Sequence, residues 1–138
     1  MLFSYFQENL LRFRVLLHNV ITDYGRLHRK IMDLDVSIRL VTICTNTGEI
    51  MYSDHREGVR NLLTPEESKS SLQLAINAWK TRSELAPKIG KGKYVLAEYE
   101  KIKRITMPLS DNKHLVYITT EIPSDHKKII DGVRQMVL

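Results

Sequence analysis

The chain of 138 residues is poor in the residues that define several protein classes: it has one cysteine, four prolines and six glycines. A single cysteine excludes a disulfide framework and a zinc site built from several cysteines, and it is typical of proteins of the reducing cytoplasm. Because 43% of the residues are apolar and 27% are charged, the composition also excludes a disordered chain. The length predicts one compact domain with at most a short appendage.

The sequence also lacks an uninterrupted apolar run. Its most apolar stretch lies at the amino terminus, where Glu8, Arg12 and Arg14 interrupt it. A secretory signal needs a continuous apolar run, and a membrane-spanning helix needs about 20 mostly apolar residues. We therefore expect neither of them, and we expect a cytoplasmic protein.

Motifs of catalysis and metal binding are missing as well. The segment 89–93 contains two glycines but lacks the spacing and the Lys-Ser/Thr ending of a phosphate-binding loop. The five histidines include no pair three or four residues apart, so no helical metal face is visible, and no G-x-S-x-G motif is present. The sequence therefore predicts a protein that is not an enzyme and has no cofactor and no metal ligands.

What the sequence does contain is a long apolar seam at its start. From Phe3 to Ile31, apolar residues recur alternately three and four positions apart, which is the period of a helical seam. Thr22-Asp23 can begin a new helix, so the seam predicts an extension over residues 1–22 before a domain over 23–138. The seam packs either on the chain's own core or on a second chain, and an in-plane membrane helix is a weaker alternative. We predict a partner interface at Phe3, Phe6, Leu10, Phe13 and Leu17.

From residue 35 onward the pattern changes to strands and shorter helices. Segments 37–45 and 49–53 predict a hairpin around Gly48, and Thr64, Pro65 and Glu67 form a capping box that begins a helix. This helix ends near Pro87 or Gly90. Further strands are expected at 94–99, 103–109 and 114–121, and a last helix follows. The predicted fold class is α+β, a five-stranded antiparallel sheet in the order α-ββ-α-βββ-α, preceded by the apolar helical extension.

This order resembles the roadblock/dynein-light-chain fold, a relative of the profilin and longin folds. The segments DVSIR at 35–39, HREGV at 55–59, KYVLA at 93–97 and DHKKII at 125–130 are similar to a family of archaeal proteins of about this size. The resemblance spans residues 23–138. It implies homodimers or heterodimers with regulatory or scaffold roles toward small GTPases, motors or polarity systems, and it supplies no catalytic residues.

Two clusters of polar residues are candidate sites. The first, in the loop after the hairpin, consists of His55, Arg56, Glu57 and Arg60. The arginines can hold a carboxylate or phosphate, or they can pair only with neighbouring groups. The second is basic and carries most of the chain's net charge of +5. It can bind anions or simply form a solvated sheet edge, and its members are Lys88, Lys91, Lys93, Lys101, Lys103 and Arg104.

The preferred hypothesis for function is a non-catalytic, dimerising interaction or regulatory module. An alternative is a small-ligand sensor of the PAS or profilin type, with a pocket between the sheet and helix 65–86. A weaker alternative is nucleic-acid binding through a basic stripe from Lys88 to Arg104. A protein partner of unknown identity is compatible with the first hypothesis.

Overall fold

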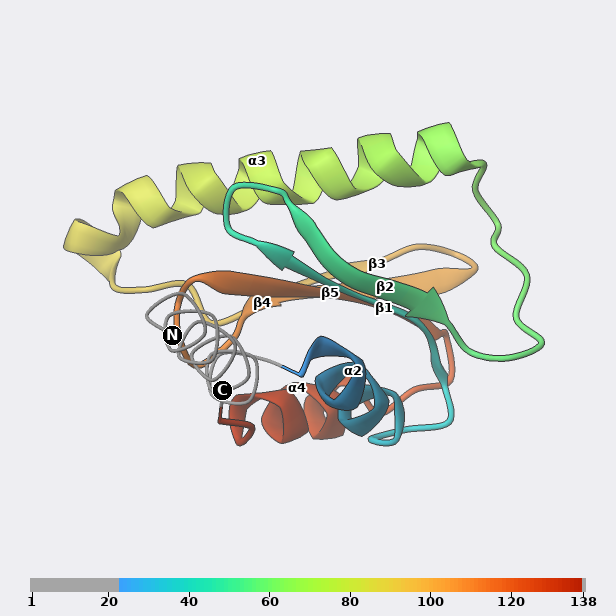
Figure 1. Cartoon of the computed structure of the whole chain (residues 1–138). Coiled ribbons are helices and arrows are strands. Elements are labelled where there is room, and N and C mark those ends of the chain that lie inside the picture. The colour runs from blue at the N-terminus through green and yellow to red at the C-terminus, as the bar shows by residue number, and fades with distance from the viewer. Residues whose placement is uncertain (1–22, 138) are drawn as a thin grey trace, which may run out of the picture.

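A five-stranded antiparallel sheet lies between one long helix and two short ones (Figure 1). The computed structural model describes residues 23–137. Their order confirms the predicted α-ββ-α-βββ-α fold; the predicted extension and its interface residues Phe3, Phe6, Leu10, Phe13 and Leu17 lie outside the described range. Along the chain the elements are α2 (Tyr24–Met32), β1 (Ile38–Thr45), β2 (Ile50–His55), α3 (Pro65–Ile89), β3 (Val95–Glu98), β4 (Ile102–Pro108), β5 (His114–Glu121) and α4 (His126–Arg134).

The strands are arranged in the order β2-β1-β5-β4-β3. Sequential hairpins join β1 to β2, β3 to β4 and β4 to β5, and the long pairing of β1 with β5 connects the two halves of the sheet. Helix α3 carries the chain from the β2 edge to the β3 edge. Within residues 23–137, β2 and β3 therefore form the two edges of the sheet.

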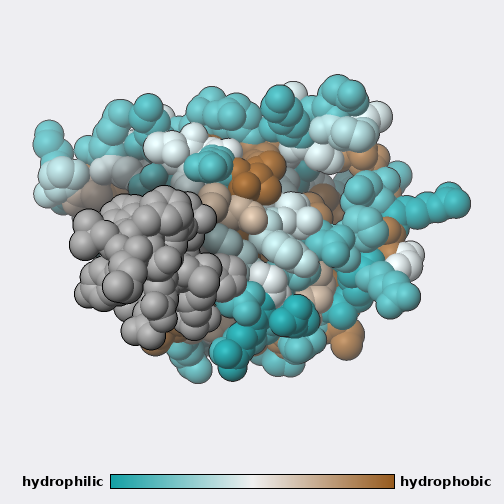
Figure 2. Space-filling view, in the orientation of Figure 1, coloured by the Kyte–Doolittle hydropathy of each residue, from teal (hydrophilic) through white to brown (hydrophobic). Residues whose placement is uncertain are grey.

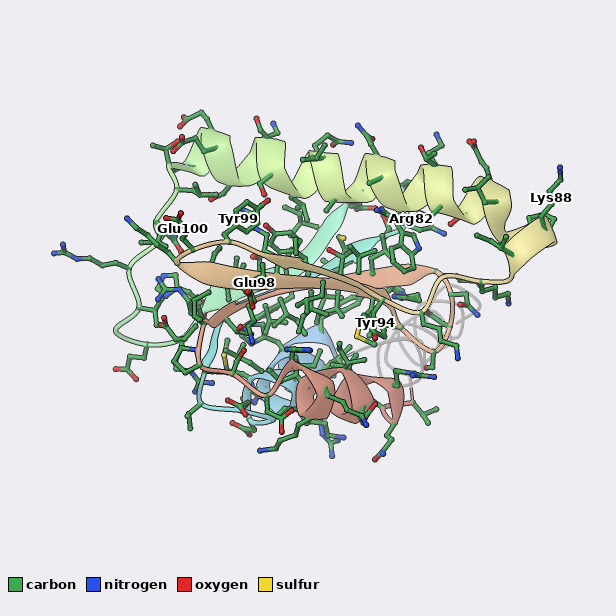
Figure 3. All side chains as sticks on the ribbon, turned by 180° about the vertical axis from the view of Figure 1, so that it is seen from behind. Arg82, Lys88, Tyr94, Glu98, Tyr99 and Glu100 are labelled. Atoms are coloured by element: carbon green, nitrogen blue, oxygen red, sulfur yellow. The ribbon has the colours of Figure 1, made fainter. Side chains whose placement is uncertain are left out.

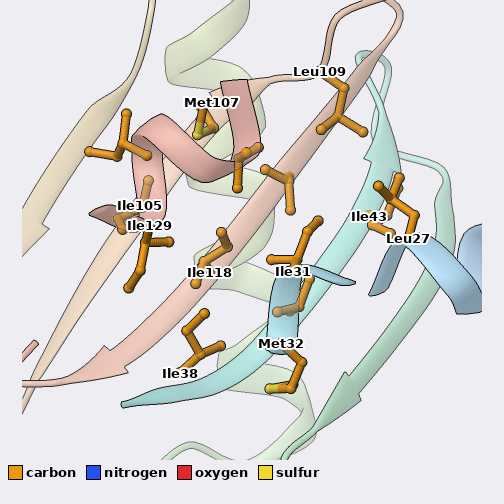
Figure 4. Close-up of a cluster of buried hydrophobic side chains, with 14 residues drawn as sticks. Leu27, Ile31, Met32, Ile38, Ile43, Ile105, Met107, Leu109, Ile118 and Ile129 are labelled. Carbon is orange, nitrogen blue, oxygen red and sulfur yellow. The ribbon is translucent and has the colours of Figure 1, made fainter. Parts of the chain in front are cut away.

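One face of the sheet is covered by α2 and α4 (Figure 4). Strand residues point alternately to the two faces, and most of those facing these helices are apolar, with the buried Lys103 as an exception. The cluster contains side chains with no exposed surface from both layers, namely Ile31, Ile38, Val41, Ile43, Ile105, Met107, Val116, Ile118 and Ile129. The close approach of α4 to the chain after α2 depends on Gly132, where a Cβ atom would lie 2.5 Å from a Leu34 methyl group.

Among residues 23–137, α3 is the one helix that covers the opposite face. This helix has 25 residues, about 38 Å at the usual rise, yet only Leu72, Ile76 and Trp79 are buried. They contact a small cluster on the sheet that includes Cys44 and Tyr117. In Figure 2, hydrophilic side chains cover the outer side of α3, and apolar ones are visible between α3 and the sheet. This face is therefore covered less completely than the other.

The ends of the helices follow local signals in the sequence. The side chain of Asp23 caps α2 and that of Asp125 caps α4, each by accepting a backbone N–H. Thr64 and Glu67 form the predicted capping box of α3, and the helix ends at Ile89, with Gly90 at a positive φ of 92°. Such a φ suits glycine, which explains why the helix ends there and not at Pro87.

Candidate functional site

The side of the molecule where α3 passes over β3 has exposed tyrosines, Tyr94 and Tyr99, among charged side chains such as Arg82 and Glu98 (Figure 3). Strand β3 has only four residues and pairs only with β4 within the described chain. Its outer edge therefore presents backbone N–H and C=O groups that a further strand can pair with. Tyr94 and Tyr99 flank the strand, and they are 47% and 49% exposed.

Helix α3 contributes a second apolar row to this side. Leu74, Ala78 and Leu85 are four and seven residues apart, so they share one face of the helix, and that face is not the one holding Leu72 and Ile76. Leu74 is 66% exposed and Leu85 is 50% exposed. We call Leu74, Ala78, Leu85, Tyr94, Tyr99 and the outer edge of β3 the α3–β3 surface.

A groove of about 150 Å³ lies between α3 and the β3–β4 hairpin. Small side chains line part of it, namely Ala75, Ala78 and Ala97, beside Leu74 and Val95. Alanines at this position keep the backbones of the helix and the strand accessible to a large side chain. The α3–β3 surface therefore combines an open strand edge, exposed leucines and a shallow groove.

The loop after β2 is fixed by Arg56, one of the candidate site residues. Its guanidinium donates hydrogen bonds to the carbonyl oxygens of Ile38 at 2.8 Å, Met32 at 2.8 Å and Asp35 at 2.9 Å. These contacts tie the loop to the end of α2 and the start of β1. The geometry therefore supports the alternative in which Arg56 pairs with neighbouring groups of the chain and does not hold a ligand. Its partners are backbone carbonyl oxygens and not charged side chains.

The other three candidates in this loop do not converge with Arg56 on one point. The His55 ring donates from Nδ1 to the carbonyl oxygen of Arg56 at 3.0 Å, and Glu57 is exposed. The carbonyl oxygen of Arg60 accepts a hydrogen bond from Arg39 at 2.7 Å. Ligand binding by His55, Glu57 or Arg60 stays a prediction.

The structure does not gather the six basic residues into one stripe. Lys103 and Arg104 are neighbours in β4, so their side chains point to opposite faces of the sheet. Lys103 is buried near the start of α4, where its Nζ lies 3.3 Å from the Ser124 carbonyl oxygen and 3.8 Å from a carboxylate oxygen of Glu98. Arg104 lies on the α3 side, with its guanidinium 5.0 Å from the centre of the Tyr99 ring.

The remaining basic residues lie in two separate places. Lys88 is in the last turn of α3, and Lys91 and Lys93 follow in the loop before β3. Lys101 lies in the turn between β3 and β4, which is at the opposite end of β3. Anion binding by the group at 88–93 stays a prediction, and Lys101 is separated from that group by the length of the strand.

A partly buried chain of hydrogen bonds joins the β4–β5 turn to α2, and sequence patterns did not predict it. The carboxylate of Asp111 accepts from His114 Nδ1 at 2.6 Å, and His114 Nε2 lies 3.0 Å from the Tyr24 hydroxyl. Burial raises the pKa of Asp111, but hydrogen bonds from the Lys113 backbone and from His114 lower it by more, so that this pKa lies below its usual value. This chain attaches the start of α2 to the sheet.

The other reactive groups give no catalytic arrangement. Cys44 is buried, and burial raises the pKa of its thiol to about 11, so it stays protonated and unreactive at neutral pH. Between residues 23 and 137, no group of three or more His, Cys, Asp or Glu side chains could hold a metal ion. In the same part of the chain no helix is both long enough and apolar enough to cross a membrane.

Comparison with known proteins places the fold. No protein-family model matches this sequence, and no curated protein matches it. Among solved structures, the chain is similar to a Roadblock/LC7 domain from Streptomyces avermitilis, with a TM-score of 0.58 and 9% identity over 77% of this chain and 87% of that one. It is similar to Myxococcus xanthus MglB with a TM-score of 0.59 and 12% identity, covering 82% of this chain and 95% of MglB.

A third similar structure is an MglB with a tetrameric arrangement, which has a TM-score of 0.63 and 10% identity over 79% of this chain and 80% of that one. At such low identity the similarity lies in the arrangement of helices and strands. These matches confirm the resemblance drawn from the order of elements, while the archaeal origin stays a prediction. The chain has the Roadblock/LC7 fold that is also found in MglB.

Proposed function

We propose that this protein is a non-catalytic regulatory module that acts as a dimer, and that the α3–β3 surface joins its two copies. The observation that carries the proposal is the α3–β3 surface itself, with its open strand edge beside two half-exposed leucines. The tetrameric arrangement of one MglB supports self-association as a property compatible with this fold.

A two-fold axis beside β3 makes the contact self-complementary. Each β3 would pair antiparallel with the β3 of the other copy, so that each edge is covered by an identical one. The two α3 helices would then lie side by side and bury Leu74 and Leu85 of both copies. A four-residue strand pair alone is weak, so the leucines supply most of the apolar area of the contact.

A regulatory role requires a further partner that recognises the dimer. The exposed loop after β2 and the basic residues at 88–93 are two charged surfaces of the described chain that are open to such a partner. The weaker nucleic-acid alternative has less support, because Lys103 is buried and Arg104 lies between two tyrosine rings. The amino-terminal residues Phe3, Phe6, Leu10, Phe13 and Leu17 stay predicted as an additional contact between chains.

The test is the oligomeric state of the full chain by sedimentation velocity at micromolar concentration. We expect a dimer for the wild type and a monomer for the double variant Leu74→Glu/Leu85→Glu, which places four carboxylates in the contact. The matched control is Val36→Glu/Val137→Glu, since these two valines are 89% and 88% exposed and lie outside the α3–β3 surface. Circular dichroism checks that all variants stay folded.

Two results would contradict the proposal. A monomeric wild type would remove the dimer, and a double variant that still dimerises would remove the α3–β3 surface as the contact. In the latter case, the double variant Phe6→Glu/Phe13→Glu tests the predicted amino-terminal interface. If this variant is monomeric while Leu74→Glu/Leu85→Glu is still a dimer, the contact between the two copies lies at the amino terminus.

A further inference from the structure

A second hollow under α3 is larger than the groove at β3 and lies toward the other end of the helix. It has a volume of about 400 Å³, within the range of about 300–1,000 Å³ that is usual for small-molecule sites. Its walls are the first two turns of α3, the loop 59–63 and the sheet strands β2, β1, β5 and β4. Leu72, Ile76 and Trp79 fill the space under the middle of the helix, and the pocket lies beside them.

The walls of this pocket are mainly apolar. Side chains from five separate stretches of the chain form them, and the apolar ones include Leu40, Leu62, Leu63, Leu72 and Ile102. Leu62 is 57% exposed, although it lies against an apolar hollow. An apolar ligand in the pocket would remove part of this leucine from water, which is a favourable contribution to binding.

The charged groups of the pocket all have the same sign. Arg39, Lys69 and Arg104 line it, and no aspartate or glutamate does. Arg39 is already satisfied, because it pairs with Glu121 at 2.6 Å and donates to the Arg60 carbonyl at 2.7 Å. Through that second bond Arg39 holds the loop over the pocket, and it leaves Arg104 and Lys69 to receive an anion.

The side chain of Arg104 has a hydrogen-bond donor without an acceptor. Its Nε atom is buried and has no acceptor among residues 23–137. One terminal nitrogen donates to the Tyr99 hydroxyl at 3.3 Å, and the guanidinium carbon lies 5.0 Å and 5.6 Å from the ring centres of Tyr99 and Tyr117. The two rings thus hold the guanidinium in place at the pocket wall. A buried charged donor without an acceptor is unfavourable, and a carboxylate oxygen would satisfy it.

We propose that this pocket binds a small amphipathic carboxylate, with the carboxylate on Arg104 and Lys69 and the apolar part against the leucines. Arg104 and Tyr117 also line the groove at β3, and Tyr99 of the α3–β3 surface contacts Arg104, so the two sites adjoin. The leucines of the proposed dimer contact, Leu74 and Leu85, do not line the pocket, so Leu74→Glu/Leu85→Glu tests the dimer without changing a pocket residue. The proposed pocket corresponds to the small-ligand sensor alternative of the sequence analysis. It specifies the end of α3 at which the ligand binds and the chemical class of the ligand.

The test is isothermal titration of the full chain with decanoate below its micelle concentration, with decanol as the neutral control of equal chain length. We expect saturable binding of one decanoate per chain and much weaker binding of decanol. Arg104→Gln should weaken decanoate binding at least about tenfold and leave decanol binding unchanged. Circular dichroism checks that this variant is folded.

A second variant keeps the test decisive if Arg104→Gln unfolds. Leu62→Glu changes an exposed side chain at the pocket and adds a like charge, so it should weaken decanoate binding by a similar factor. Val36→Glu, at an exposed valine away from the pocket, should leave it unchanged. The proposal is overturned by absence of saturable decanoate binding, by equal binding of decanol, or by full affinity in Leu62→Glu.

Discussion

The two faces of the sheet are built differently. Within residues 23–137, the face under α2 and α4 holds one continuous cluster of fourteen buried hydrophobic residues, while the cluster under α3 has six. Four of the nine residues of α2 and three of the nine of α4 are buried, whereas only three of the 25 residues of α3 are. The closed face holds the fold together, and the incompletely covered face retains the groove, the pocket and the exposed leucines on which both proposals depend.

The difference between the faces can be measured through their stability contributions. Ile118 is fully buried on the closed face, so Ile118→Ala should lower the free energy of unfolding by about 4 kcal/mol, toward the upper end of the usual range for such changes. Ile76 lies under α3, where the neighbouring hollows let the chain relax, and Ile76→Ala should cost only about 2 kcal/mol. Urea denaturation of both variants measures these losses. Equal losses in the free energy of unfolding would contradict the difference between the two faces of the sheet.

An effect smaller than that of Ile118→Ala is expected at Arg56, which joins the loop after β2 to the end of α2 and the start of β1. Arg56→Met keeps most of the apolar stem but leaves the carbonyl oxygens of Met32, Asp35 and Ile38 without this donor. We expect a loss of about 2–3 kcal/mol in the free energy of unfolding. Arg60→Met is the matched control, since Arg60 accepts its hydrogen bond through the backbone carbonyl, and it should change stability by less than about 0.5 kcal/mol.

The smallest effect concerns Asp111, whose carboxylate stabilises the attachment of α2 only while it is ionised. Since its folded pKa lies below the usual value of about 3.9, its contribution is complete above that pH and is lost as the pH falls through the folded pKa. Asp111→Asn should therefore cost about 1 kcal/mol near neutral pH. The difference from wild type should shrink below about pH 4, as measured by urea denaturation across pH. A difference independent of pH would contradict this account.

The sequence predicted the features that depend on neighbouring residues. The capping box at Thr64 and Glu67, the hairpin at Gly48 and the order of strands and helices all follow from local spacing and turn chemistry, and the structure confirms them. The separation of Lys103 from Arg104 also has a local cause, because adjacent positions in a strand face opposite sides of the sheet. A single basic stripe through both residues is therefore incompatible with the strand that the sequence predicts over 103–109.

The remaining features depend on residues far apart in the chain. The Tyr24–His114 contact spans 90 positions, and Arg56 reaches carbonyls up to 24 positions away. The pocket requires the loop 59–63, α3 and four strands to meet, and no spacing in the sequence encodes that meeting. The α3–β3 surface likewise follows from the strand order, which makes β3 an edge and places α3 beside it.

The most direct test of the proposed dimer compares the two edges of the same sheet. Amide hydrogen exchange of the full chain is measured at two protein concentrations, one below and one above the dissociation constant of the dimer. We predict that protection of the amides of β3 and of α3 around Leu74 and Leu85 increases with concentration, while that of the other edge, β2, stays constant. Protection that increases at β2, or that does not change with concentration at β3, would contradict the α3–β3 surface as the contact between two copies.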